Sequence, residues 1–387
     1  MTHWTARRRL RTAVVGASAL ALGLGAVAAT GSAQATGKHR GGFGSDNPAV
    51  VIAGLDNPRQ LAVGHHGSLL AAISGRGGTE CQGTGEEEQC IGATSGIGKL
   101  LHPGAKRPKA RVVVGGLPSA AGPDGSFAGG VSGVSVSRLG TFGVGAAPPE
   151  LGSPTGGLAG KLFVVKKGKA VPVADLAAYE AAKDPDGQGV ESNPYSVLAQ
   201  DRRVLVADAA GNSIVAVDKR GKISTFHVFG NITTGDCAGR PNDAGTTGCD
   251  FVPTSLAQGP HGTVYVTGLA SEAEGEGRVV VLSARGKKLA EWSGFSSPVG
   301  VAVKKHGEFY VSELLVGFNP ADPEFDPSTV GQVTKVKWNQ RVSRQVPFPA
   351  GIAIVRGKLY VAAWSIAPST GAFGNPDWTG RILRMSL

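Results

Sequence analysis

The hydrophobic pattern of the chain is a series of short apolar runs separated by turns that contain glycine. One unit recurs: a proline, a small apolar run, a glycine-containing turn, and a second apolar run led by an aromatic residue. It is clearest in "VPTSLAQGPHGTVYVTGL" (252–269) and "SPVGVAVKKHGEFYVSEL" (297–314). Short β-branched and aromatic runs between such turns are typical of β-strands. The pattern therefore predicts pairs of antiparallel strands rather than helices.

The unit occurs six times, and the copy at 129–146 lacks the proline. The prolines at 194, 253, 298 and 349 are 45 to 59 residues apart, a spacing typical of propeller blades. The other copies occupy residues 57–74, 193–212, 252–268, 297–313 and 348–363. Third strands are predicted at Ser213–Asp218, Arg278–Ser283, Gln332–Lys337 and Arg381–Leu387, and fourth strands at Ser224–Phe229 and Leu289–Trp292. The chain is thus predicted to be an all-β six-bladed propeller of four-stranded antiparallel blades.

The two ends of the repeat region complement each other. The last copy supplies only three strands before the chain ends, and an unpaired apolar run, residues 49–53, precedes the first copy. If this N-terminal strand completes the last blade, the ring closes and no sheet edge stays open. An open β-sandwich would not explain six copies. We therefore expect one propeller domain over residues 49–387.

The N-terminus has the features of an export signal. Arg7, Arg8, Arg9 and Arg11 precede an apolar, alanine-rich stretch, and Ala33-Gln34-Ala35 fits a small-x-small cleavage site. A membrane anchor is the alternative, but the apolar stretch is short and interrupted by glycine. We expect residues 1–35 to be a cleaved signal peptide and residues 36–48 a flexible linker. The mature protein would then be secreted and without a membrane span.

Charge argues against a nucleic-acid partner. The whole chain has a net charge of +10, and removal of residues 1–35 leaves 35 basic and 29 acidic residues, a net charge of +6. The remaining lysines and arginines are scattered, mostly in turns, and form no basic helix or basic-aromatic stripe. A nucleic-acid function is therefore not expected.

The four cysteines are Cys81, Cys90, Cys237 and Cys249. In an exported protein an even number suggests disulfides, and three pairings are possible. The two short spacings favour Cys81–Cys90 and Cys237–Cys249, each closing one loop. A zinc site is the alternative, although neither pair has the close spacing or the nearby histidine of such sites.

The sequence resembles the ScyD/ScyE family of exported proteins, named after members encoded beside scytonemin biosynthesis genes. The resemblance spans nearly all of the mature chain and rests on "GLDNPRQLAVG" (54–64), "ESNPYSVLA" (191–199) and "VADAAGNSIVAV" (206–217). Two departures are the lack of an acidic residue at the strand end 266–268 and the cysteine-bounded insertion 237–249. The resemblance implies an exported, NHL-like propeller, and it supplies neither a reaction nor a catalytic residue.

Candidate ligand residues follow the second strand of each copy, where propellers present side chains at the mouth of the channel. Asp208 and Glu313 stand there, and two carboxylates facing one channel could hold Ca²⁺ with asparagine oxygens. The alternative for Asp208 is a cap on its own turn. Further channel-mouth candidates are Arg59 for an anion, Tyr195 for stacking on a ring, Trp364 as a pocket wall, and Asn57, Asn193 and Asn212 as oxygen ligands.

No catalytic constellation stands out in the sequence. It lacks a His-Glu-x-x-His metal helix, a Gly-x-Ser-x-Gly elbow and a phosphate-binding glycine loop. We therefore favour a monomeric binding or scaffold protein whose partner is a small molecule or an envelope or extracellular protein. The alternative is a propeller enzyme, either a calcium-dependent lactonase like gluconolactonase or a lyase like virginiamycin lyase.

Overall fold

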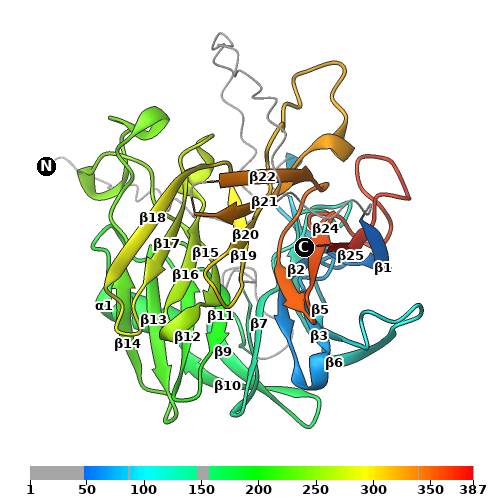
Figure 1. Ribbon diagram of the computed structural model, residues 1–387, viewed down its shortest axis with the longest axis horizontal. Coiled ribbons are helices and arrows are strands. Elements are labelled where there is room, and N and C mark those ends of the chain that lie inside the picture. The colour runs from blue at the N-terminus through cyan, green and yellow to red at the C-terminus, as the bar shows by residue number, and fades with distance from the viewer. Residues whose placement is uncertain (1–47, 86–87, 146–156, 339, 387) are drawn as a thin grey trace, which may run out of the picture.

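The computed structural model describes residues 48–85, 88–145, 157–338 and 340–386. They form six separate antiparallel sheets arranged as blades around one ring (Figure 1). The predicted all-β six-bladed propeller is therefore confirmed. The predicted signal segment 1–35, and all of the predicted linker except residue 48, lie outside the described residues.

Each blade has four main strands. Blade 1 consists of β2 (Pro58–Val63), β3 (Leu69–Ile73), β5 (Gln89–Leu101) and β6 (Lys109–Ala121). Blade 2 consists of β7 (Val131–Ser137), β8 (Gly140–Gly145), β9 (Lys161–Lys166) and β10 (Lys169–Asp175). Blade 3 consists of β11 (Pro194–Ala199), β12 (Arg203–Asp208), β13 (Ser213–Asp218) and β14 (Ile223–Val228). Blade 4 consists of β15 (Pro253–Gln258), β16 (Val264–Gly268), β17 (Gly277–Leu282) and β18 (Lys288–Phe295). Blade 5 consists of β19 (Pro298–Val303), β20 (Phe309–Glu313), β21 (Gln332–Lys337) and β22 (Gln340–Gln345). Blade 6 consists of β23 (Ile352–Val355), β24 (Lys358–Ala363), β25 (Gly380–Ser386) and β1 (Ala49–Leu55).

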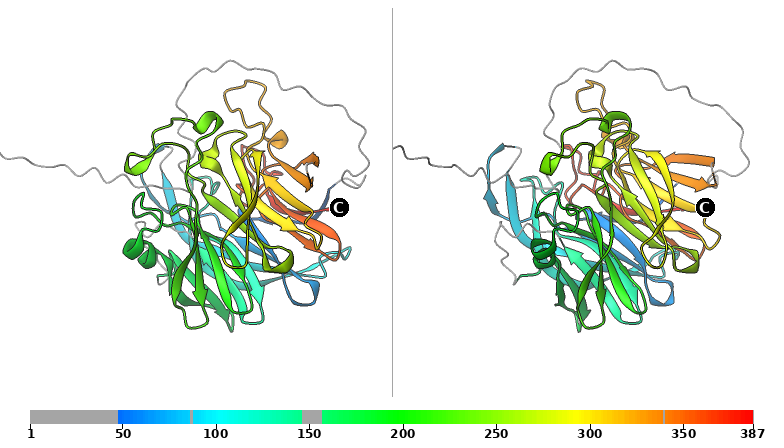
Figure 2. Two further views of the ribbon diagram at one scale, coloured as in Figure 1. Left: turned by 60° about the vertical axis from the view of Figure 1, so that its left-hand side comes forward. Right: turned by 90° about the vertical axis from the view of Figure 1, so that its left-hand side faces the viewer.

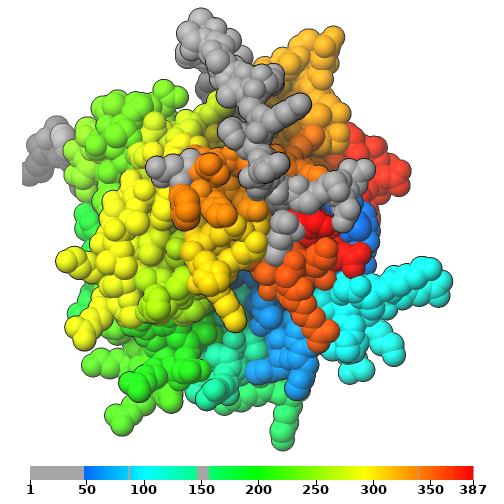
Figure 3. All heavy atoms as spheres, viewed as in Figure 1, coloured from blue at the N-terminus to red at the C-terminus, as the bar shows by residue number. Residues whose placement is uncertain are grey.

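The N-terminal strand closes the ring as predicted. Strand β1 pairs antiparallel with β25, with Ile52 opposite Ile382, and so becomes the outer strand of blade 6. The space-filling view shows these two ends of the chain, blue and red, in contact (Figure 3). Closure joins the first and last described strands and gives blade 6 its fourth strand.

The first strands of neighbouring blades contact one another and form the inner ring. Each is the edge strand of its own sheet, so its outward N–H groups need acceptors outside that sheet. Side-chain oxygens from the inner strand of the preceding blade accept several of these N–H groups. The bonds are Val134 N–H to Gln60 Oε1 (3.1 Å), Ala199 N–H to Ser135 Oγ (3.0 Å), Leu256 N–H to Ser196 Oγ (3.1 Å) and Val301 N–H to Ser255 Oγ (3.3 Å).

Glycine replaces this device where blades 5, 6 and 1 meet. A Cβ at Gly300 would lie 2.5 Å from the carbonyl oxygen of Ala350, and one at Gly351 would lie 2.4 Å from the amide nitrogen of Leu61. Both distances are shorter than any real carbon contact, so these backbones approach closely only without side chains. The small inner-strand residues seen in the sequence thus have a steric cause.

Both favoured disulfides are present, Cys81–Cys90 and Cys237–Cys249. The first joins the short strand β4 (Glu80–Gln82) to β5, and the second closes the loop between blades 3 and 4. The α-helix α1 (Leu176–Lys183), which the repeat pattern did not predict, lies at the edge of the molecule outside the blades (Figure 2). No helix in the described ranges is long and apolar enough to cross a membrane.

We predict that Ser196→Ala destabilises the fold. Ser196 is 1% exposed, and its loss would leave the buried N–H of Leu256 without its acceptor. The expected cost is about 1–3 kcal/mol in the free energy of unfolding, measured by denaturant titration. Ser224→Ala, at an exposed position in the same blade, is the matched control. Equal unfolding midpoints for the two variants would contradict this role for the inner-ring oxygens.

Candidate functional site

Asp208 and Glu313 occupy equivalent positions at the ends of β12 and β20. Each is the register partner of the proline that opens the inner strand of its blade, Pro194 for Asp208 and Pro298 for Glu313. Both carboxylates are buried, with 2% and 3% of the residue surface exposed. The repeat alignment that singled them out therefore located two structurally matched sites.

The Asp208 carboxylate accepts three hydrogen bonds from its own blade. The donors are the hydroxyl of Ser192 at 2.6 Å, the N–H of Asn193 at 2.6 Å and the N–H of Gly211 at 3.3 Å. Burial raises the pKa of Asp208, and these hydrogen bonds oppose that increase by stabilising the charged form. Asp208 thus connects the residues just before β11 to the turn after β12, as a capping carboxylate would.

Glu313 is held in a similar way. Its carboxylate accepts hydrogen bonds from the N–H of Ser296 at 2.9 Å, from the amide of Gln332 at 2.9 Å and from the hydroxyl of Thr334. Within the described ranges, neither Glu313 nor Asp208 belongs to a cluster of three metal-ligating side chains. Their joint role in calcium binding remains a prediction.

The other channel-mouth candidates also make contacts within the protein. Arg59 is 9% exposed and donates to the carbonyl of Ala128 at 2.9 Å, whereas Tyr195 is half-buried on β11. Asn57 donates to the carbonyls of Gly75 and Gly125, both at 2.8 Å. These bonds tie the channel mouth of blade 1 to neighbouring loops. As ligand-binding residues they remain predictions.

Trp364 lies in an aromatic cluster on the loops of blades 5 and 6. It is 2% exposed and stacks on Trp378, with ring centroids 4.9 Å apart and planes 15° apart. Phe348 packs on Trp364, with ring centroids 5.6 Å apart. In this arrangement the indole of Trp364 is part of the hydrophobic core.

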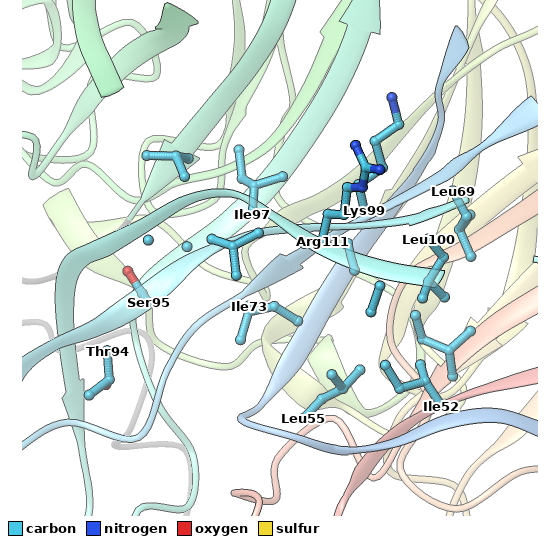
Figure 4. A pocket seen from close by; sticks show the side chains of 18 of the residues that line it. Ile52, Leu55, Leu69, Ile73, Thr94, Ser95, Ile97, Lys99, Leu100 and Arg111 are labelled. Atoms are coloured by element: carbon cyan, nitrogen blue, oxygen red, sulfur yellow. The ribbon is translucent and has the colours of Figure 1, made fainter. Parts of the chain in front are cut away.

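A cavity of about 330 Å³ lies between the outer part of blade 6 and blade 1. Ile52 and Leu55 of β1 line one side, and Leu69, Ala71 and Ile73 of β3 line the other (Figure 4). The long β5–β6 hairpin supplies most of the remaining lining, including four glycines, Gly96, Gly98, Gly115 and Gly116.

Missing side chains create this cavity. Gly98 lies opposite Ala71 in the register, and a Cβ on it would meet nothing within 4 Å. The hairpin tip projects from the body of the molecule (Figure 3), and Val112 on its outer strand is 80% exposed. The cavity is thus open along β6. The sequence did hold a signal for it, since several glycines fall inside two paired strands, but the repeat pattern alone did not point to them.

The charged residues at the cavity do not face its interior. Lys99 and Arg111 are register partners on β5 and β6, while their neighbours Gly98 and Leu100 pair with Ala71 and Leu69 on the cavity side. Because side chains alternate along a strand, Lys99 and Arg111 point to the opposite face. Figure 4 shows their charged ends side by side, away from Ile52 and Leu55.

The polar side chains at one end of the cavity are bonded within the protein. Ser95 donates to the carbonyl of Pro118 at 2.7 Å, and Thr94 donates to the carbonyl of Gly77 at 2.9 Å. The cavity is therefore mostly apolar along its walls, and the two titratable residues in its lining, Lys99 and Arg111, direct their charged ends away from Ile52 and Leu55. It suits desolvation of an apolar group rather than acid–base chemistry.

A separate cluster of carboxylates lies beside blade 3. Oxygen atoms of Glu180, Asp184 and Asp186 lie within 4.8 Å of one another, and Glu180 is 1% exposed. These three residues were not among the candidates predicted from the sequence, although Asp208 and Asn212 are close by. The motif "DPDGQG" (184–189) with its alternating acids was the available signal.

Comparison with known proteins identifies neither a family nor an activity. No family model matches the chain, and no curated protein matches it. Virginiamycin B lyase from Staphylococcus aureus is 12% identical, with 87% of this chain and 97% of that chain covered and a TM-score of 0.44. Regucalcin from Agrobacterium tumefaciens is 11% identical, with coverages of 88% and 94% and a TM-score of 0.46. Aldose sugar dehydrogenase from Streptomyces coelicolor is 12% identical, with coverages of 87% and 96% and a TM-score of 0.49.

We predict that Asp208→Ala lowers stability by about 2–4 kcal/mol, because three donors lose their shared acceptor. Asp208→Asn, which keeps one acceptor oxygen, should cost less. Chemical denaturation of both variants tests this. A stability equal to that of the unchanged protein would contradict the capping role and leave the carboxylate free for chemistry.

Proposed function

We propose that the protein is an exported binding propeller that holds a small apolar molecule, or the apolar part of a larger one, between blades 6 and 1. The observation that carries this proposal is the open cavity of about 330 Å³. Ligand sites are commonly concave, mostly apolar and at least about 300 Å³ in volume. Export rests on the sequence features of residues 1–35 and accords with the two disulfides.

The lining supports binding rather than catalysis. Isoleucine and leucine side chains and glycine backbone provide contact area, and the nearby hydroxyls already donate to carbonyls. A ligand here would gain affinity mainly by removing apolar surface from water, at about 25 cal/mol per Å². A charged group bound between Ile52 and Leu55 would lose its hydration without a partner, because the charged ends of Lys99 and Arg111 are directed away from these two residues.

The enzyme alternative needs carboxylates that can reach a substrate. Asp208 and Glu313 each already accept three hydrogen bonds from their own blade. Neither carboxylate lines the apolar cavity. This arrangement favours a binding protein over a lactonase or a lyase.

We predict that N-phenyl-1-naphthylamine, a neutral naphthalene dye, binds the mature protein with increased fluorescence and raises its melting temperature. The dye should bind only the folded protein, because the two walls of the cavity come together only when the ring closes. Gly98→Leu should lower dye affinity about tenfold or more, because the new side chain occupies the open space that Gly98 faces.

Gly230→Leu is the matched control. Gly230 is exposed, and a Cβ on it also meets nothing within 4 Å, but it lies outside the cavity. This variant should bind the dye as the unchanged protein does. Equal dye affinity of Gly98→Leu and the unchanged protein would remove the cavity as the binding site.

A further inference from the structure

The connection between blades 2 and 3 brings three carboxylates to one point. Helix α1 begins at the N-cap Asp175, whose carboxylate accepts from the N–H of Ala178, and it ends at Asp184, where the backbone becomes left-handed. Pro185 follows and cannot continue the helix. This stop places Asp184 and Asp186 beside Glu180 of the last helical turn, with oxygens within 4.8 Å of one another.

Glu180 is unusual among the three because it is buried. It is 1% exposed, and its Oε1 has no hydrogen-bond partner among the described residues. A Cβ on Gly211 would lie 2.8 Å from its Oε2, so the turn after β12 packs directly against the carboxylate. An unpaired carboxylate oxygen in such a position is costly unless a ligand satisfies it.

The three carboxyl groups are not neutralised by nearby basic side chains in the described part of the chain. No ion pair within the described ranges involves Glu180, Asp184 or Asp186. The C-terminal end of α1 adds the partial negative charge of its free carbonyls, which favours a cation. Burial, followed by the charges of Asp208, Asp186 and Asp184, raises the pKa of Glu180 to about 8.

We propose that Glu180, Asp184 and Asp186 bind a calcium ion. All three offer oxygen ligands, and the group contains neither histidine nor cysteine, which zinc and the softer metals prefer. Calcium accepts irregular sets of six to eight oxygens, and nearby carbonyls and water can complete the set. This site differs from the channel-mouth pair Asp208 and Glu313, and it is independent of the apolar cavity.

The contacts around the site indicate what calcium would stabilise. Asn212, at the turn after β12, donates to Asp186 at 3.1 Å. Gln188 donates its N–H to Asp186 at 3.0 Å and accepts from Thr246 at 2.9 Å, inside the Cys237–Cys249 loop. An ion at Glu180, Asp184 and Asp186 would therefore hold the blade 2–3 connection against blade 3 and this disulfide loop.

The test compares melting temperatures of the mature protein in a chelator and in about 5 mM calcium chloride. Calcium should raise the melting temperature of the unchanged protein by at least a few degrees. In Glu180→Gln the rise should disappear, while the variant in chelator should melt no lower than the unchanged protein, since glutamine keeps the shape of the side chain and places no charge beside Asp184 and Asp186. Isothermal titration calorimetry with calcium chloride should show one site in the unchanged protein and none in the variant.

Glu274→Gln makes the same chemical change at an exposed glutamate outside the cluster and should keep the full calcium response. An absent calcium response in the unchanged protein, or a full response in Glu180→Gln, would overturn the proposal. An equal response to magnesium chloride would overturn the choice of calcium. None of these results depends on the apolar cavity, because the dye experiment with Gly98→Leu is read out separately.

Discussion

The inner strands depend on hydrogen bonds that leave their own sheets. In each blade the first strand is a sheet edge, so part of its backbone has no partner within the blade. Oxygens of Gln60, Ser135, Ser196 and Ser255 accept N–H groups of the next blade, and glycine allows direct backbone contact near Gly300 and Gly351. The blades therefore stabilise one another, and we expect the ring to unfold as one cooperative unit.

A ring of this kind must close, and closure determines where the cavity lies. Strand β1 comes from the N-terminal end of the domain and joins β25, so blade 6 is built from both ends of the chain. The cavity lies at this seam, with β1 on one side and blade 1 on the other. Anything that binds there contacts both walls and favours the closed ring over the open one.

The repeat made the architecture predictable. Proline-led inner strands, glycine turns and the unpaired run at 49–53 were enough to predict six blades and closure, and the short cysteine spacings predicted both disulfides. The sites were harder, because they depend on side chains that meet only in three dimensions. Asp208 and Asn212 drew attention to blade 3, but Glu180 approaches from a helix that precedes this blade in the sequence. The cavity was missed because glycines such as Gly98 act there by leaving space empty.

Hydrogen–deuterium exchange of the mature protein, with and without N-phenyl-1-naphthylamine, tests the central claim most directly. If β1 closes the ring and lines the binding cavity, the amides of 49–55 that pair with β25 should be protected from exchange, and the central strand 380–386 should be protected more completely because it pairs on both sides. The dye should slow both further and leave residues 213–228 unchanged. Exchange of every amide of 49–55 at the rate of an unfolded chain, or protection that the dye does not alter, would contradict the account.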